Sequence, residues 1–276
     1  MRVCFLALAI FCLGSVSGQY YFNDLIATQQ SVLQYQLLRA NKVKKIIATS
    51  YEEDQSPTEG FVLEQELTMD GKKLITKTGI SSGKTSDVTS FFELGKLKRT
   101  QSNSNGIDNK MEYLFNEKGK LIKLTLTSSD TAVRYQTQEI REWQYNAEGM
   151  PVELIKVKNK RDSSKATFVF DEQGNIGEER WTRKQQAMET YYYYYDQLKR
   201  LTDIVRYHTK LQKLVPDYVF EYDERGKLSQ MTQLSGTGAY FTWKYLYNEK
   251  GLKIKETCFD SYQKVVGRIE YRYEFH

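Results

Sequence analysis

The sequence predicts an all-β protein with one α-helix near its N-terminus. The main evidence is a motif of two aromatic residues one position apart, followed by Asn or Asp and, three residues later, by Gly; it recurs about every 25 residues. Between copies, apolar and polar residues alternate as in strands. We therefore expect an antiparallel meander of repeated β-hairpins that forms a curved or partly closed sheet.

Composition narrows the class of protein. The 276 residues include 40 Lys and Arg against 35 Asp and Glu, and 40% of them are apolar, which excludes a disordered tail and a helical membrane protein. The two histidines exclude a His-rich metal site. Tyr is abundant, with 21 residues, and Phe contributes 13. The small positive net charge of +5 gives no reason to expect a nucleic-acid partner.

Residues 1–18 have the features of a signal peptide. Arg2 precedes the apolar stretch Val3–Leu13, and Val16 and Gly18 place small residues before a cleavage site at Gln19. The alternatives are a buried N-terminal strand or an uncleaved anchor, but eleven apolar residues fall short of the ~20 that span a bilayer. Cleavage would leave only one cysteine and no internal disulfide. We expect export to the periplasm, the outer-membrane surface or the extracellular space of a Gram-negative bacterium.

Residues 19–52 are predicted to form the helix and the first strand. Over residues 23–41, Asn23 can cap a helix, with Ile26, Leu33, Leu37 and Ala40 on one stripe. This helix would pack on the sheet or close its open end, or else bind a partner. Alternation then starts at Val43 and places Val43, Lys45, Ile47, Thr49 and Tyr51 on one side of a strand.

Residues 53–276 form the predicted repeat region. Its six clearest copies have Asn or Asp at the start of the turn, and five of them have Gly three positions later. The predicted turn residues are Asn116 and Gly119, Asn146 and Gly149, Asp171 and Gly174, Asp196, Asp223 and Gly226, and Asn248 and Gly251. Lys199 stands where the fourth copy lacks Gly.

Each part of the motif has a structural role. Two aromatic residues separated by one position point to the same face of a strand. The Asn or Asp side chain can accept hydrogen bonds from backbone N–H groups just ahead, and Gly can adopt the positive φ that closes the turn. Successive hairpins would place all of these turns along one edge of the sheet. Lys199 must adopt the left-handed conformation or change its turn.

The motif resembles the tyrosine–aspartate repeats (YD or RHS repeats) of bacterial secreted and cell-surface proteins. The best match is FEYDERGKL from Phe220, and the resemblance covers about residues 110–276. It implies a curved antiparallel sheet that wraps into a shell or spiral. Some members of that family are associated with carbohydrate binding and some with toxin delivery. The resemblance implies structural roles for the motif residues and supplies no catalytic residue.

No segment predicts an active site. TGISSGKT at Thr78–Thr85 has the wrong spacing for a phosphate loop and is interpreted as a hairpin turn. His208 lies near Asp203, but the sequence shows no nucleophile on a strained turn that could complete a catalytic triad with them. We therefore interpret His208 as an ordinary strand residue. Cys258 is expected to be a small, at least half-buried thiol. We therefore predict a protein without enzymatic activity, cofactor or bound metal.

Two groups of residues are candidates for facing a ligand. In the run Tyr191–Tyr195, alternate rings must lie on both faces of the strand, so Tyr192 and Tyr194 would lie opposite the aromatic ladder, beside Trp181 and Trp243. They can stack on sugars or on a protein, or form a second layer of packing. Alternating lysines can meet an acidic polymer or simply keep a strand soluble. These lysines are Lys156, Lys158 and Lys160.

Three functions follow from this pattern. The first is a non-catalytic envelope or surface scaffold that binds a polysaccharide or an envelope protein. The second is an outer-membrane β-barrel, which strands near ten residues fit and charges on both strand faces oppose. The third is a periplasmic half-barrel that carries a lipid or lipoprotein beneath a helical lid. No transmembrane helix is expected after residue 18, and association with a membrane surface stays open.

Overall fold

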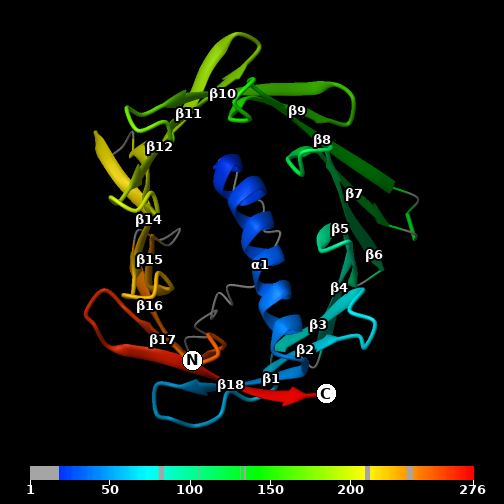
Figure 1. Ribbon diagram of the computed structural model, residues 1–276, viewed down its shortest axis with the longest axis vertical. Helices are drawn as coiled ribbons and strands as arrows, with labels where there is room; N and C mark the ends of the chain where they lie inside the picture. Colours follow the sequence, from blue (N-terminus) through cyan, green and yellow to red (C-terminus); the bar gives the residue numbers. More distant parts are fainter. Residues whose placement is uncertain are drawn as a thin grey trace.

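The computed structural model describes residues 19–80, 84–104, 106–130, 132–133, 135–208, 212–234 and 239–276. The predicted signal peptide and the tip of the predicted turn at Thr78–Thr85 lie outside these residues. The described chain begins with the π-helical turn η1 (Tyr21–Ile26), continues into α1 (Ala27–Ala40) and then forms one 18-stranded sheet (Figure 1). The strands are β1 (Val43–Glu52), β2 (Val62–Leu67), β3 (Lys73–Ile80), β4 (Lys84–Glu93), β5 (Lys96–Ser104), β6 (Ile107–Phe115), β7 (Leu121–Asp130), β8 (Tyr135–Tyr145), β9 (Pro151–Lys158), β10 (Asp162–Phe170), β11 (Ile176–Arg183), β12 (Gln186–Tyr195), β13 (Leu201–His208), β14 (Lys213–Tyr222), β15 (Leu228–Leu234), β16 (Tyr240–Tyr247), β17 (Lys253–Phe259) and β18 (Val265–Phe275).

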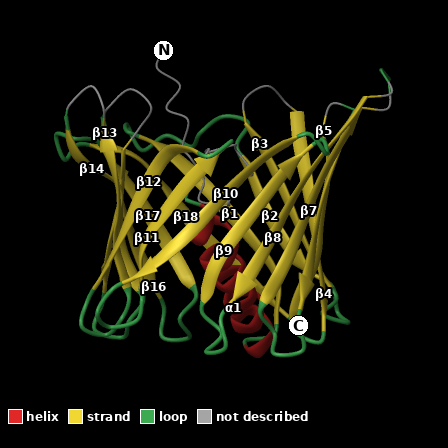
Figure 2. Ribbon diagram, turned by 90° about the horizontal axis from the view of Figure 1, so that it is seen from above, coloured by secondary structure: helices red, strands yellow, loops and turns green. Residues whose placement is uncertain are grey.

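The sheet closes into a barrel. Each strand pairs antiparallel with the next along the chain, and β1 also pairs with β18, from Val43 opposite Phe275 to Glu52 opposite Gly267. The all-β meander with one N-terminal helix is thereby confirmed. The sheet is closed rather than open, so the half-barrel of the carrier hypothesis does not form. Figure 2 shows the tilted strands from the side of the barrel.

The two faces of the barrel wall differ in chemistry. Along each strand, alternate side chains point into the lumen, where the motif aromatics Phe168, Tyr193 and Phe220 are buried. The outward positions carry ion pairs, such as Lys45–Glu64 at 2.9 Å and Lys123–Glu142 at 2.8 Å. The apolar core therefore lies inside the barrel, and the outer surface carries ion pairs together with exposed apolar side chains such as Leu114 and Leu246.

Helix α1 lies inside the barrel and packs against one side of the wall (Figure 1). The ring of Tyr35 stacks on Phe92 with centroids 3.8 Å apart, and its hydroxyl donates to the Gly71 carbonyl at 2.7 Å. Leu38 is buried beside it, whereas Leu33, on the predicted apolar stripe, is 55% exposed to the lumen. The predicted stripe is correct for Ile26 and Leu37, which pack against the core, and wrong for Leu33 and Ala40, because the wall contacts the helix along the side that carries the Tyr35 ring.

The beginnings of the helix and of the first strand also differ from prediction. Helical structure starts at Tyr21, and Asn23 lies within it instead of capping it. A register shift between Val43 and Lys45 turns Val43 inward, so it does not share a face with Lys45. A bulge adds one residue to a strand and therefore reverses the alternation at that point.

All of the predicted turns that start with Asn or Asp lie at one end of the barrel. We call this end the turn rim; it carries the connections from β2–β3 through β16–β17 that join even strands to odd ones, together with the start of β1. In the turn at Asp223, the backbone N–H of Gly226 donates to the Asp223 carbonyl at 2.9 Å, and Oδ1 accepts from Lys227 N at 2.8 Å. Lys199 keeps the same turn and takes the left-handed conformation, with φ 59°.

Where the second aromatic of the motif is Tyr, it links its hairpin to the one before it. The Tyr222 hydroxyl donates to the Leu201 carbonyl at 2.7 Å. Ladder pairing between those two strands starts only at Asp203, so the Leu201 carbonyl lies beyond its end. Four further tyrosines bond equivalent carbonyls: Tyr145 to Leu121, Tyr195 to Ile176, Tyr247 to Leu228 and Tyr273 to Lys253. The phenol therefore satisfies a backbone acceptor that the ladder does not reach.

We expect Tyr222→Phe to lower the free energy of unfolding by about 1 kcal/mol, because the Leu201 carbonyl loses its donor while the ring stays in place. Urea unfolding measures the effect. Tyr262→Phe is the control, because Tyr262 is 89% exposed at the opposite end of the barrel. Equal stability of the two variants would show that the hydroxyl contributes nothing.

Candidate functional site

Buried charged groups gather inside the barrel where the chain's first described residues meet the wall. We call this group the lumenal anchor; it consists of Asp24, Arg141, Lys156, Glu179 and Asp217. Asp24 comes from η1, and the other four come from β8, β9, β11 and β14. Residues far apart in the sequence thus converge on the N-terminal segment.

Glu179 is completely buried and holds the start of η1. Its carboxylate accepts hydrogen bonds from the backbone N–H groups of Tyr20 at 2.9 Å and Tyr21 at 3.0 Å. It also accepts from Trp181 Nε1 and from the Tyr193 hydroxyl, both at 2.6 Å. Burial raises the pKa of Glu179, and these four donors oppose that rise. The carboxylate supplies the cap that no side chain of η1 itself provides.

Asp24 is the second buried acid of the anchor. Its Oδ1 accepts a hydrogen bond from Arg141 Nη1 at 2.6 Å, and Arg141 also pairs with Glu139 at 2.7 Å. Burial raises the pKa of Asp24 to about 6, because loss of water outweighs the attraction of the Arg141 guanidinium. The pair therefore ties η1 to β8 with an acid that holds its proton more tightly than an exposed Asp does.

The remaining contacts complete the attachment of the N-terminal segment. Lys156 Nζ donates to the Tyr20 hydroxyl at 2.8 Å, and it lies 4.8 Å from the centre of that ring. Asp217 accepts from Gln19 Nε2 at 2.5 Å and from Arg206 Nε at 2.8 Å. Because the acids of the anchor are held by donors from the protein itself, the anchor acts as a clamp on the chain.

A second feature lies on the outer face of the wall, across β10, β11 and β12. A groove of about 420 Å³ is lined there by Val169, Gly177, Glu178, Tyr192 and Tyr194, together with neighbouring residues near the Asp171 turn. We call it the outer-wall groove. Tyr194 is 48% exposed, and Tyr192 lies directly opposite Glu178 in the ladder. No Lys or Arg lines the groove.

The geometry of the outer-wall groove suits a flat, neutral ligand with hydroxyl groups. The phenol rings of Tyr192 and Tyr194 stand two residues apart on one strand face, which spaces them by about 7 Å. Gly177 leaves the floor open; a methyl group there would meet Asp171 N at 3.5 Å and Val169 O at 3.7 Å. The Glu178 carboxylate, held by Arg180 Nε at 2.6 Å, supplies a hydrogen-bond acceptor at the side.

The other predicted ligand-facing residues lie elsewhere. Trp181 and Trp243 are buried on the lumenal face, so they do not join Tyr192 and Tyr194. Lys156 also points inward, to Tyr20, which contradicts its role in meeting an acidic polymer. Lys158 and Lys160 lie at the opposite rim, at the end of β9 and in the connection to β10. The bulge in β11 reverses its alternation and turns Trp181 inward. Trp243 lies two residues before the buried motif aromatic Tyr245 on β16, so it shares the lumenal face with the aromatic ladder.

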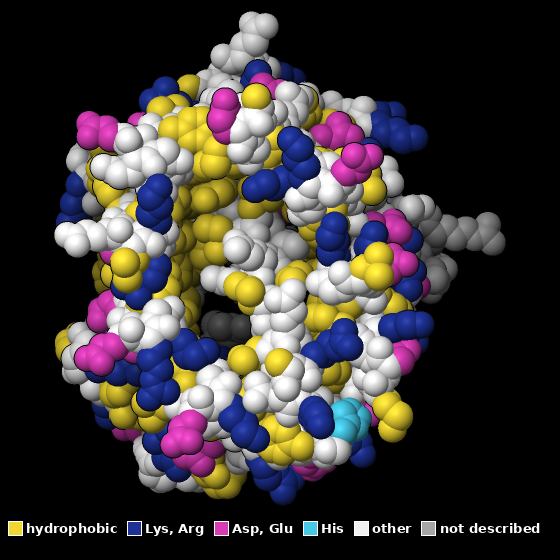
Figure 3. Space-filling model, viewed as in Figure 1, with side chains coloured by type: hydrophobic (Ala, Val, Ile, Leu, Met, Phe, Trp, Pro, Cys, Tyr) yellow, Lys and Arg dark blue, Asp and Glu magenta, His cyan; other side chains and the backbone are white. Residues whose placement is uncertain are grey.

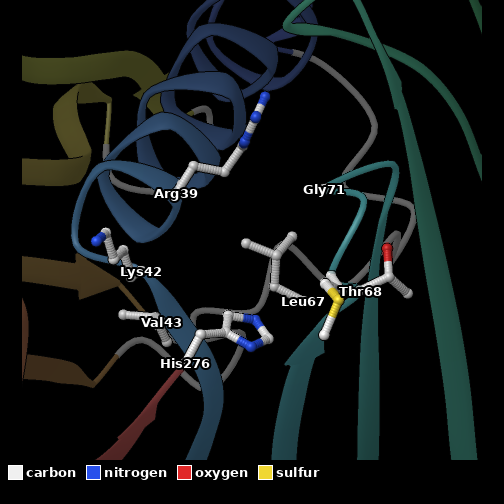
Figure 4. Close-up of a pocket in the computed structure, with 8 residues that line it drawn as sticks. Arg39, Lys42, Val43, Leu67, Thr68, Gly71 and His276 are labelled. Atoms are coloured by element: carbon white, nitrogen blue, oxygen red, sulfur yellow. The ribbon is translucent and has the colours of Figure 1, made fainter.

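A third hollow opens at the turn rim, where α1 ends. It measures about 290 Å³, and Figure 4 shows Arg39, Lys42 and His276 around it, with Val43 and Leu67 between Arg39 and His276. Arg39 extends toward the β2–β3 turn; its Nε would lie 2.9 Å from a side-chain carbon at Gly71. We call this hollow the mouth pocket. No Asp or Glu lines it.

Sequence reasoning missed Glu179, Asp24 and Gly177. Glu179 follows another Glu in a strand and looks like one more solvated charge, and Asp24 looks like the first-turn acid of a helix. Of the three, only Gly177 could have been found from the sequence, because a Gly inside a strand often marks a bulge or a place where a ligand approaches the backbone closely. Their roles depend on contacts between residues more than a hundred positions apart, such as Glu179 and Tyr20.

Comparisons with known proteins add little. No protein-family model and no curated protein matches the chain. Among solved structures, a TcdB2–TccC3–Cdc42 complex is 14% identical over 75% of this chain, with a TM-score of 0.34, and this chain spans only 12% of the matched chain. Porin-like proteins from Bacteroides uniformis and Bacteroides vulgatus are each 11% identical, over 85% and 84% of this chain and 97% and 98% of theirs, with TM-scores of 0.40 and 0.27. Similarities this weak carry no functional conclusion.

The described residues offer neither a metal site nor a membrane-spanning helix. No group of three or more His, Cys, Asp or Glu residues is arranged to hold a metal ion. None of the described helical segments is long and apolar enough to cross a membrane.

We expect the free energy of unfolding to fall as the pH rises from about 4 to about 6, by about 2 kcal/mol on account of Asp24. In this range the folded chain keeps a proton on Asp24 that the unfolded chain, with its ordinary pKa of 3.8, has released. Asp24→Asn cannot titrate, so the difference between the two proteins isolates this group. Urea unfolding at both pH values measures it, and parallel pH dependences would contradict the raised pKa.

Proposed function

We propose that the protein is an exported, non-catalytic barrel of the bacterial envelope that works in water and binds a glycan on its outer wall. The signal-peptide features of residues 1–18 support export. The ion pairs on outward positions of the strands favour an aqueous exterior, because each would lose its hydration in lipid. A protein ligand at the same surface is the alternative occupant.

The outer-wall groove carries the proposal. It combines two outward phenol rings, an open floor at Gly177 and the acceptor Glu178. Phenol rings stack on the C–H faces of sugars while carboxylates accept hydrogen bonds from sugar hydroxyls. A volume of about 420 Å³ lies within the range of small-ligand sites. The absence of Lys and Arg from its lining favours a neutral saccharide over an acidic one.

We expect purified protein to pellet saturably with isolated peptidoglycan or neutral cell-surface polysaccharide, and Tyr192→Ala with Tyr194→Ala to weaken binding about tenfold or more. Gly177→Ala should also weaken it, because its methyl group enters the floor at ordinary contact distances. Tyr262→Ala, at the opposite rim, is the control. Wild-type binding by the double Tyr variant would remove the groove as the glycan site.

An outer-membrane barrel is the second candidate function. Closure leaves no unpaired edge, and β1, β4, β7, β12 and β14, at ten residues each, have the length of membrane-spanning strands. The two candidates differ in solubility. We expect the protein to be monodisperse without detergent, measured by size-exclusion chromatography with light scattering. Solubility only in detergent would make the membrane barrel the better proposal.

A further inference from the structure

Two large apolar side chains project from the turn rim with almost no protein contact. Met69, in the β2–β3 turn, is 90% exposed, and Leu94, in the neighbouring β4–β5 turn, is 97% exposed. Single exposed apolar residues are common on protein surfaces. Met69 and Leu94, however, are among the most exposed apolar residues of the described chain, and they stand at the tips of adjacent turns at one end of the barrel.

Leu94 is at a position where the fold disfavours leucine. Leu94 and Gly95 both have positive φ, 48° and 78°, as in the two-residue turn that prefers Asn–Gly. A leucine there is strained by its Cβ, and its side chain gains no packing in return. The folded structure alone therefore gives no reason for leucine at this tip.

The same sector of the rim is basic. Residues 39–42, 68–73, 93–98 and 116–120 surround the two tips and contain eight Lys and Arg against three Asp and Glu. The next two turns along the rim, 146–150 and 171–175, contain no basic residue and three acidic ones. Figure 3 looks onto this rim and shows Lys and Arg side chains around the mouth. The positive charge is therefore concentrated where the apolar tips project.

The mouth pocket lies within this basic sector. Arg39 comes from the last turn of α1, Lys42 from the start of β1, and His276 from the end of β18 (Figure 4). Arg39 and Lys42 form no ion pair with another described residue. Val43 and Leu67 add apolar side chains to the lining, which gives the pocket the amphipathic character of a lipid headgroup site.

We propose that this sector of the turn rim docks on an anionic lipid surface. Met69 and Leu94 would enter the region below the headgroups, while the surrounding Lys and Arg contact phosphates and the mouth pocket receives one headgroup. Electrostatic attraction to a soluble polyanion would need the cations but not the apolar tips. In this docked position the acidic turns 146–150 and 171–175 would stay away from the lipid surface, so the barrel axis would be tilted relative to it.

Vesicle flotation with the purified protein, residues 19–276, tests this proposal. We expect binding to vesicles of phosphatidylglycerol mixed with phosphatidylcholine, weakened by high salt, and little binding to phosphatidylcholine alone. Lys42→Gln should weaken binding about fivefold, and Met69→Ser and Leu94→Asn about tenfold each. Equal binding to both kinds of vesicle would overturn the proposal. So would loss of binding in inorganic phosphate at constant ionic strength, which would assign the pocket to free phosphate.

Leu94→Asn separates docking from folding because the two effects have opposite signs. Asn suits the left-handed position, so the urea midpoint should rise while lipid binding falls. Tyr262→Ser and Lys184→Gln remove an exposed ring and an exposed cation at the opposite rim and should leave binding unchanged. Wild-type binding by both Leu94→Asn and Met69→Ser, or equal loss in the two controls, would refute docking through the turn rim. These results do not depend on the outer-wall groove.

Discussion

The pairing of β1 with β18 is the interaction on which the rest of the structure depends. It closes a sheet of 18 strands among the described residues, and a barrel that wide cannot be filled by the side chains of its own wall. The inward aromatic face would then meet water. The N-terminal segment resolves this conflict by entering the lumen, where Tyr20, Phe22 and Tyr35 pack on the wall. The segment is therefore part of the core.

Burying the segment creates a polar problem that the lumenal anchor resolves. A helix start inside a barrel leaves backbone N–H groups without water, and Glu179 accepts the bonds of Tyr20 and Tyr21. Burying that carboxylate is costly in turn, so Trp181 and Tyr193 also donate to it. Asp24 and Arg141 follow the same logic. The polar groups in the lumen thus fix the position of the segment more specifically than apolar contact could.

The repeat unit explains why the outer surface is free to carry function. Turn closure by Asn or Asp, the tyrosine bond to the preceding hairpin and the inward aromatic ladder all use the lumenal face or the turn backbone. The outward positions and the turn tips lie outside this shared set of contacts. Two surfaces with different chemistry arise there: the aromatic outer-wall groove, which carboxylates but no cations line, and the basic, apolar sector of the turn rim. The groove lies on the wall and the basic sector lies on the rim, so a ligand at one of them leaves the other free.

The strand order, the turns at one edge and the outward direction of Tyr192 and Tyr194 could be predicted from the sequence, because period-two alternation and Asn/Asp-x-x-Gly turns are local. Closure, the place of α1 in the lumen and the inward direction of Trp181 could not. Bulges of one residue at Val43 and Gly177 reverse the faces locally, and no local pattern marks them unambiguously. Glu179 and Asp24 gained their roles only when the barrel brought distant strands around the N-terminal segment, because the loss of water on burial is a property of the whole fold.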